Sequence, residues 1–197
     1  MDSGLFNHLT QFVSEERVKL FEEKINERTN QVTLVLEDLY QPQNTSAAIR
    51  TCDCFGIQNI HIIENENEFL IYKDVVVGAT KWVNVNRYNE HENNTLQCFD
   101  KLRKDGYKII ATTPLPGAKS IYDLPMDDKL AIVLGNEGYG ISDIVKQEAD
   151  EFVTIPMYGF TESFNISVSA AICLSEFSSR LRDSDIKGQL EKEEKKK

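Results

Sequence analysis

Residues 155–171 read IPMYGFTESFNISVSAA and join an expected strand to an expected helix. The apolar residues 152–155 are typical of a buried strand, and the apolar spacing over 163–181 is typical of a long helix. Ser163, Asn165 and further serines place small polar groups at the start of that helix, where free N–H groups need acceptors. A capped helix whose small residues serve packing alone is the alternative explanation of this pattern.

A second polar cluster, GNEGYGIS at residues 135–142, follows the expected strand at 130–134. Its glycines allow positive φ angles and close approach of the backbone to a ligand. They run GxxGxG, so the loop matches neither the GxGxxG dinucleotide fingerprint nor the Gly-Lys-Ser/Thr phosphate loop. The Glu137 carboxylate could orient a substrate or accept a proton. An ordinary glycine turn before a helix is the alternative.

A third cluster, QPQNTSAAIRT, occupies residues 41–51 after the expected strand at 31–36. The pattern predicts a helix over 44–55, with Asn44 or Thr45 as its cap and Arg50 about two turns inside. A helix N-terminus offers N–H groups to an anion, and an arginine offers a planar fork to a phosphate. The alternative is a capping Asn44 and a surface Arg50 that pairs with a carboxylate.

The remaining apolar patterns alternate between strand and helix. Strands are expected at 31–36, 59–63, 83–88, 107–112, 130–134 and 152–155, and helices at 5–27, 44–55, 95–104, 141–149 and 163–181. Such alternation predicts an α/β fold with a mostly parallel sheet covered by helices, and ligands bind beyond the carboxyl ends of its strands. We expect an N-terminal helical extension at 1–28, a main domain at 29–183 and a charged C-terminal tail at 184–197.

Composition sets the class of protein. The 197 residues suffice for one α/β domain, and no segment resembles a signal peptide or a membrane span, so we expect a cytoplasmic protein. The net charge of −10 argues against broad nonspecific binding of nucleic acid but allows a local basic patch. Cys52 and Cys54 lack the usual metal or redox spacing, and the histidines are dispersed. We therefore expect reduced thiols and no metal site.

The three clusters together resemble the SPOUT class of methyltransferases, and within it the TrmH-type RNA ribose 2′-O-methyltransferases. The resembling motifs are N-x5-R at Asn44 and Arg50, GNEGYGIS and IPMYGFTESFNISVSAA, each after a strand and in the family's order over residues 31–182. The resemblance implies an α/β-knot fold with a deep C-terminal trefoil knot. The N-terminal helix and the lack of an added RNA-binding domain look most like the subgroup that methylates guanosine 18 in the tRNA D-loop.

The resemblance also implies a cofactor and an assembly. The family binds S-adenosylmethionine in a bent shape, and its members act as homodimers whose active sites are shared between subunits. The positions that match its cofactor-binding residues are Thr112, Thr113, Leu134, Gly135, Asn136, Gly140, Ile155, Met157, Ser163, Phe164 and Asn165.

Arg50 matches the family's central catalytic residue, and Asn44, Glu137, Ser163 and Asn165 match further catalytic positions. A guanidinium keeps its proton in proteins, so we expect Arg50 to clamp the phosphate beside the target ribose and to stabilise the developing alkoxide. Besides Arg50, the basic residues expected to contact RNA are Arg17, Lys19, Lys24, Arg28, Arg180 and Arg182. For these helical residues a solvated helix face is the alternative.

Other functions remain open at this stage. The substrate could be another nucleotide of tRNA or ribosomal RNA, or the chain could be an RNA-binding paralogue without activity. The presence of Arg50, Glu137 and Asn165 argues against the inactive paralogue. A nucleotide-dependent oxidoreductase is disfavoured because the glycine spacing is wrong. Hydrolytic chemistry is disfavoured because no GxSxG or HExxH motif occurs.

Overall fold

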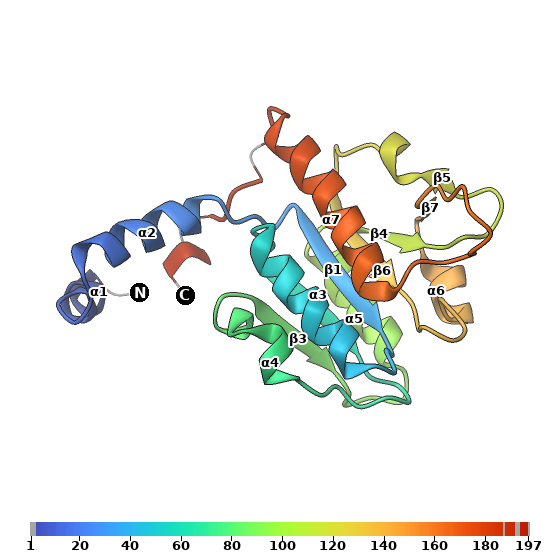
Figure 1. Cartoon of the computed structure of the whole chain (residues 1–197), viewed down its shortest axis with the longest axis horizontal. Coiled ribbons are helices and arrows are strands. Elements are labelled where there is room, and N and C mark those ends of the chain that lie inside the picture. The colour runs from blue at the N-terminus through green and yellow to red at the C-terminus, as the bar shows by residue number, and fades with distance from the viewer. Residues whose placement is uncertain (1–2, 187, 192–193, 197) are drawn as a thin grey trace.

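A parallel sheet forms the centre of the structure, a computed structural model that describes residues 3–186, 188–191 and 194–196. Within these residues the strand order is β3-β2-β1-β6-β4-β7-β5, and every pairing between named strands is parallel (Figure 1). The strands are β1 Val32–Glu37, β2 Asn59–Ile63, β3 Asn84–Tyr88, β4 Tyr107–Thr112, β5 Lys119–Ser120, β6 Lys129–Leu134 and β7 Glu151–Thr154. The predicted mostly parallel α/β sheet is confirmed.

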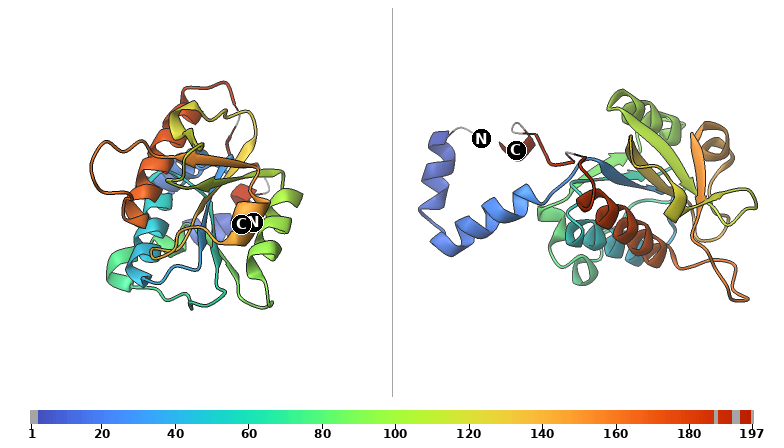
Figure 2. Two further views of the ribbon diagram at one scale, coloured as in Figure 1. Left: turned by 90° about the vertical axis from the view of Figure 1, so that its right-hand side faces the viewer. Right: turned by 90° about the horizontal axis from the view of Figure 1, so that it is seen from above.

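Helices cover both faces of the sheet, as the left view of Figure 2 shows. On one face Leu34 and Leu36 of β1 pack with α3 Pro42–Cys54 and α7 Ile166–Arg182. On the other face Val35 packs with α5 Asn94–Lys104 and α6 Asp143–Glu148. Because both faces of the central strands are buried, β1 and β6 read as nearly continuous apolar runs.

Short elements fill the connections. They are α4 Lys73–Val76, η1 Ala79–Lys81, η2 Ile121–Asp123 and η3 Glu194–Lys196, where η marks a 3-10 helix. Together with β5, these elements were not expected from the sequence, because two to four residues are too few to show a hydrophobic period. Both α4 and η1 lie against α3.

The first expected helix, 5–27, is wrong as a single element: the structure has α1 Ser3–Thr10 and α2 Glu15–Asn26. Ser14 has an extended backbone between them, and its side chain accepts a hydrogen bond from the Arg17 N–H. A serine that caps a new helix ends the old one, although the apolar spacing runs on. Figure 1 shows α1 and α2 projecting away from the sheet.

Helix starts differ from the sequence prediction in three places. The helix expected from Asn44 begins at Pro42, because proline is favoured in the first turn, where its missing N–H costs nothing. The helix expected from residue 163 begins at Ile166, with Asn165 as its cap. The helix expected from residue 141 begins at Asp143 after a capping Ser142. Asn44 and Thr45 are therefore not caps but buried residues of the first turns of α3.

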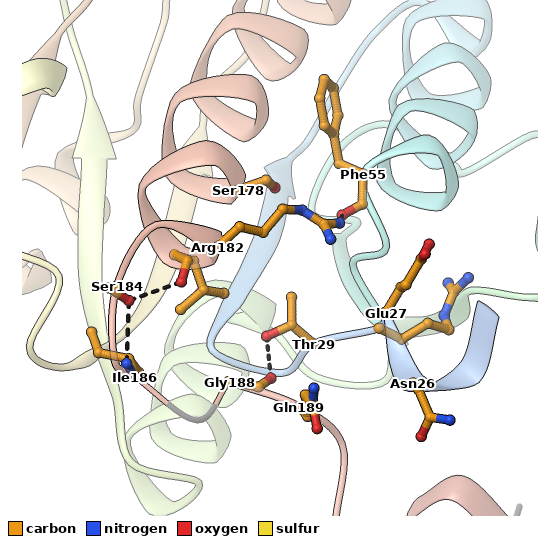
Figure 3. A pocket seen from close by; sticks show the side chains of 12 residues that line it. Asn26, Glu27, Thr29, Phe55, Ser178, Arg182, Ser184, Ile186, Gly188 and Gln189 are labelled. Carbon is orange, nitrogen blue, oxygen red and sulfur yellow. Dashed lines mark hydrogen bonds between the residues drawn. The ribbon is translucent and has the colours of Figure 1, made fainter. Parts of the chain in front are cut away.

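The described part of the C-terminal tail folds back on the start of the domain. Gln189 forms a bridge with Thr29, Leu190 is buried, and the Lys195 ammonium donates to the Asn26 side chain. An open cavity of about 320 Å³ lies between this tail, residues 26–29 and the end of α7 (Figure 3). It lies at the edge where β1 begins, opposite the polar loops that the sequence singled out.

Candidate active site

Three loops at the carboxyl edge of the sheet meet through side chains. The Glu137 carboxylate in the β6–α6 loop accepts from the Asn44 amide at 2.8 Å and from the Tyr40 backbone N–H at 2.9 Å. Asn165 precedes α7, and its side-chain NH2 group donates to the side-chain oxygen (Oδ1) of Asn44 at 3.1 Å. One chain of hydrogen bonds thus joins Glu137, Asn44 and Asn165, residues from all three sequence motifs.

The Glu137 carboxylate occupies the start of α3. Besides the Tyr40 amide, it accepts from the Gln41 backbone N–H at 3.3 Å. A helix N-terminus carries partial positive charge, so an internal carboxylate is stabilised there. Tyr40 and Gln41 directly precede α3, so the N–H groups of these two residues are taken by the chain's own carboxylate. Binding of a phosphate by the helix start or by Arg50 stays a prediction.

The glycine-rich loop is closed on itself. Asn136 and Gly140 exchange backbone hydrogen bonds of 2.8 and 2.9 Å, and Gly140 has a φ of 73°. The buried Asn136 side chain donates to the Asp38 carbonyl at 2.7 Å and accepts from the Gly138 N–H at 2.7 Å. A hydrogen bond from Asn136 to a cofactor therefore requires one of these bonds to change, unless its backbone carbonyl oxygen accepts a second hydrogen bond.

A Gly135→Ala substitution should destabilise the fold, because a Cβ atom there would lie 2.3 Å from the Gly140 carbonyl carbon and oxygen. Both are backbone atoms that cannot rotate away, so we expect unfolding free energy to fall by about 3 kcal/mol, the upper end for overpacking. Chemical denaturation measures the change. The control is Gly159→Ala, which meets nothing within 4 Å. Equal stability of the two variants would contradict the closed loop.

Two carboxylates at the end of β1 were missed by the sequence analysis. Buried Glu37 accepts from the Thr95 hydroxyl and from the hydroxyl and N–H of Ser142, so it holds the cap of α6. Asp38 has a φ of 55° and accepts from the backbone N–H groups of residues 65–67. In the sequence, the position of the two residues directly after an apolar run was the one indication of these roles.

The Tyr139 phenol of the glycine loop contacts Asp38. Its hydroxyl donates to the Asp38 carboxylate at 3.1 Å. Partial burial and this hydrogen bond raise the pKa of Tyr139 to about 12. The phenol therefore keeps its proton at neutral pH and cannot act as a general base in this arrangement.

The positions predicted for the cofactor border the same edge. The Thr112 hydroxyl donates to the Val133 carbonyl at 3.0 Å, the Thr113 N–H donates to the Val153 carbonyl at 2.9 Å, and Leu134 is buried. Ile155 and Met157 are half-buried, whereas Ser163 and Phe164 are exposed. The positions predicted for the cofactor therefore follow the carboxyl ends of β4, β6 and β7.

Arg50 lies on a different face of α3 from Asn44. It follows Asn44 by six residues on α3, which places it about 120° around the helix and about 9 Å along it. It shares a helix face with Ser46, whose hydroxyl accepts from the Tyr72 N–H at 2.9 Å. Arg50 is exposed, and within the described part of the chain its side chain has no hydrogen bond or ion pair.

The remaining residues expected to contact RNA differ in whether their side chains already bind other groups of the chain. Arg28 is buried, pairs with Asp53 at 2.9 Å and donates to Gln58 and to the Ile57 carbonyl. Arg180 donates to the backbone carbonyls of Ile121 and Leu124. Lys24 pairs with two neighbouring glutamates. Arg182 makes one 3.4 Å contact to the Phe55 carbonyl. Arg17 and Lys19 are exposed. Arg28 and Arg180 therefore serve the fold.

Other expectations concern metals, thiols and membranes. The described residues contain no cluster of His, Cys, Asp and Glu that could hold a metal ion. All four cysteines are free thiols, and burial raises the pKa of the Cys173 thiol to about 12. No helix in residues 3–186 or in the described tail has the length and apolar character to cross a bilayer.

Known proteins share both the sequence and the fold. The chain is 41% identical over 187 residues to a tRNA (guanosine(18)-2′-O)-methyltransferase of Borreliella burgdorferi, covering 95% of this chain and 84% of that one. The Aquifex aeolicus TrmH/SpoU tRNA modifying enzyme superposes with a TM-score of 0.81 at 26% identity over 92% of both chains. An AdoMet-bound rRNA methyltransferase from Sinorhizobium meliloti superposes with a TM-score of 0.67 at 21% identity, over 79% of this chain and 59% of that one.

Together with these relatives, the parallel sheet with three loops joined at its carboxyl edge identifies the chain as an α/β enzyme of the RNA methyltransferase class. The model of the SpoU rRNA Methylase family matches residues 31–175. The chain belongs to this family. The matched range contains all three sequence motifs and excludes α1, α2 and the C-terminal tail.

Proposed function

We propose that the protein transfers a methyl group from S-adenosylmethionine to the ribose 2′-hydroxyl of guanosine 18 in tRNA. The observation that carries the proposal is the hydrogen-bonded junction of Glu137, Asn44 and Asn165 beside the glycine loop. The Borreliella burgdorferi relative, aligned over nearly the whole chain, supports the substrate and position. Mapping ribose methylation in RNA from cells with and without this gene tests the position and separates tRNA from ribosomal RNA.

The cofactor fits the residues present. Ile155 and Met157 are half-buried and Phe164 is exposed, so apolar surface in the segment between β7 and α7 is left for an adenosine. S-adenosylmethionine supplies an activated methyl group when bound, so the chain has to orient the ribose and help its hydroxyl lose a proton. Thr112, Thr113, Leu134, Asn136, Ser163 and Asn165 complete the proposed cofactor site.

Within this proposal each polar residue has a separate role. Arg50 clamps the phosphate next to the target ribose and stabilises the developing alkoxide, while the phosphate or a water carries the proton away. Glu137, Asn44 and Asn165 fix the loops relative to one another through their hydrogen bonds. Ser163 is exposed in the segment before α7, and we propose that it makes hydrogen bonds within the active site.

We also infer a homodimer whose active sites are shared, with Arg50 of one subunit facing the cofactor of the other. The position of Arg50 on a different face of α3 from Asn44 supports this inference. Tyr158 and Phe160 in the loop before α7 are almost fully exposed, at 97% and 108%, and a partner subunit would cover such aromatic side chains. A trefoil knot in the C-terminal part, the domain bounds at 28 and 183, and a cytoplasmic location stay predictions.

S-adenosylmethionine should stabilise the folded protein. At a concentration one hundred times its Kd, mass action adds about 2.7 kcal/mol, which raises the Tm of a domain of this size by roughly 5–10 °C. Differential scanning fluorimetry with the cofactor and with its demethylated product measures the shift. NAD is the control and should leave the Tm unchanged. A shift with NAD and none with S-adenosylmethionine would overturn the proposed function.

A further inference from the structure

Nine basic side chains in the described part of this acidic chain are paired with carboxylates, as Lys108 and Lys119 are with Glu151. Among the residues whose side chains the structure describes, Arg17, Arg50, Lys73 and Lys81 have no carboxylate within 4 Å, and the same is true of Lys19, Lys104, Lys129 and Arg182. What distinguishes the first four is their place on four neighbouring elements, α2, α3, α4 and η1. In a protein of net charge −10, such a group of unpaired cations favours an anionic partner at this place.

These cations lie on one continuous part of the molecule. α4 and η1 pack against α3, where the Tyr72 N–H donates to Ser46, one helical turn before Arg50. Trp82 directly follows η1, and its ring lies 5.6 Å from that of Phe21 on α2. The Arg17 guanidinium covers the Phe21 ring at 5.5 Å. Figure 1 shows α4 beside α3.

Large aromatic side chains are exposed among these cations. Tyr72 and Trp82 are each 46% exposed. We call the surface formed by Arg17, Arg50, Tyr72, Lys73, Lys81 and Trp82 the Trp82 face. Exposed aromatic rings stack on unpaired bases, and neighbouring lysines and arginines contact the phosphates between them. Asp74 is a carboxylate within the 70–82 segment, so the attraction is local and not that of a strongly basic groove.

We propose that the Trp82 face binds the part of the substrate RNA next to the methylated nucleotide. Unstacked loop bases lie on Tyr72 and Trp82, Lys73 and Lys81 hold phosphates, and the strand continues to Arg50. The proposal rests on the proposed function for the nature of the substrate. It explains how so acidic a chain binds RNA: a short patch, not the whole surface, makes the contact.

Trp82 is the chain's single tryptophan, so it reports directly on this face. Adding a tRNA transcript should quench its fluorescence by about half or more in a saturable manner, after correction for absorption by the RNA. S-adenosylmethionine alone should leave the signal unchanged. A Trp82→Phe variant has no tryptophan fluorescence, so it shows whether the response comes from Trp82.

Charge reversal tests the phosphate contacts. The Lys73→Glu/Lys81→Glu variant should lower kcat/KM for tRNA by about tenfold or more and reduce the slope of log affinity against log salt by about 1–2, since each phosphate contact contributes nearly one. The matched control, Lys104→Glu/Lys129→Glu, reverses two cations that also lack a carboxylate partner but lie on α5 and β6. It should keep wild-type kinetics, and both variants should keep the Tm shift with S-adenosylmethionine.

The outcomes separate this inference from the proposed function. Suppose that the wild-type enzyme methylates tRNA, that Trp82 fluorescence does not respond to tRNA, and that the Lys73→Glu/Lys81→Glu variant stays active. These results would overturn RNA binding by the Trp82 face and leave the proposed function standing. An enzyme that never responds to S-adenosylmethionine overturns the proposed function, whatever Trp82 does. If Trp82 fluorescence changes with protein concentration and follows dimer formation in sedimentation, the face is an interface between two copies, and the RNA proposal is wrong.

Discussion

Arg50→Ala should reduce methyl transfer to tRNA by on the order of a hundredfold to a thousandfold, the usual loss when one group that stabilises developing charge is removed. The Tm shift with S-adenosylmethionine should stay close to that of the wild type. Arg50 is exposed, its side chain has no partner in the described chain, and it lies on a different face of α3 from Asn44. Its removal therefore leaves the proposed cofactor site and the core of the fold untouched.

Two further variants sharpen this result. Arg50→Lys should not restore activity, because an ammonium cannot replace the planar fork that binds a phosphate through two N–H groups. Arg103→Ala removes an arginine on α5 that pairs with Glu148, and it should leave activity unchanged. Single-turnover rates measure the chemical step in each case. Substantial activity in Arg50→Ala would remove this residue from the mechanism.

The sheet was largely predictable from the sequence. β1 and β6 read as apolar runs bounded by polar loops, because parallel strands covered on both faces have no polar side. The polar loops after them correctly indicated the carboxyl edge, since parallel strands all end there. Short elements such as α4 and β5 were missed, because their residues are too few for a period to appear.

The roles of individual polar residues were less predictable. Asn44 was assigned as a cap because asparagine is common there, but Pro42 begins the helix two residues earlier and leaves the amide free for Glu137. Arg28 was assigned to RNA, yet its guanidinium is satisfied by Asp53 and Gln58, which lie 25 and 30 residues away. A local pattern cannot show such partners, because the fold alone brings them together.

The geometry of a single chain also bears on the shared site. Asn165 caps α7 and donates to Asn44 of its own chain, whereas Arg50 lies on another side of α3. If one chain held a complete site, the Arg50 side chain would have to extend around α3 to approach Asn165 of the same chain. A second subunit related by a two-fold axis can place its Arg50 opposite the first subunit's Asn165 without any such movement.

A mixed dimer of Arg50→Ala and Asn165→Ala should therefore regain about half of the wild-type activity per dimer, although each variant alone is inactive. With sharing across the interface, one site of the mixed dimer carries both lesions and the other carries none. Co-expression of the two variants with different affinity tags, followed by purification through both tags, yields mixed dimers for the assay.

The controls are each variant purified alone and a double-tagged wild-type dimer, and sedimentation must show that both variants still dimerise. Asn165→Ala removes a helix cap worth about 1 kcal/mol, so its Tm must also show that it remains folded at the assay temperature. If each site were built within one chain, every site of the mixed dimer would keep one lesion, and no activity would return. Sedimentation of the wild-type protein as a monomer would defeat the shared site before any assay.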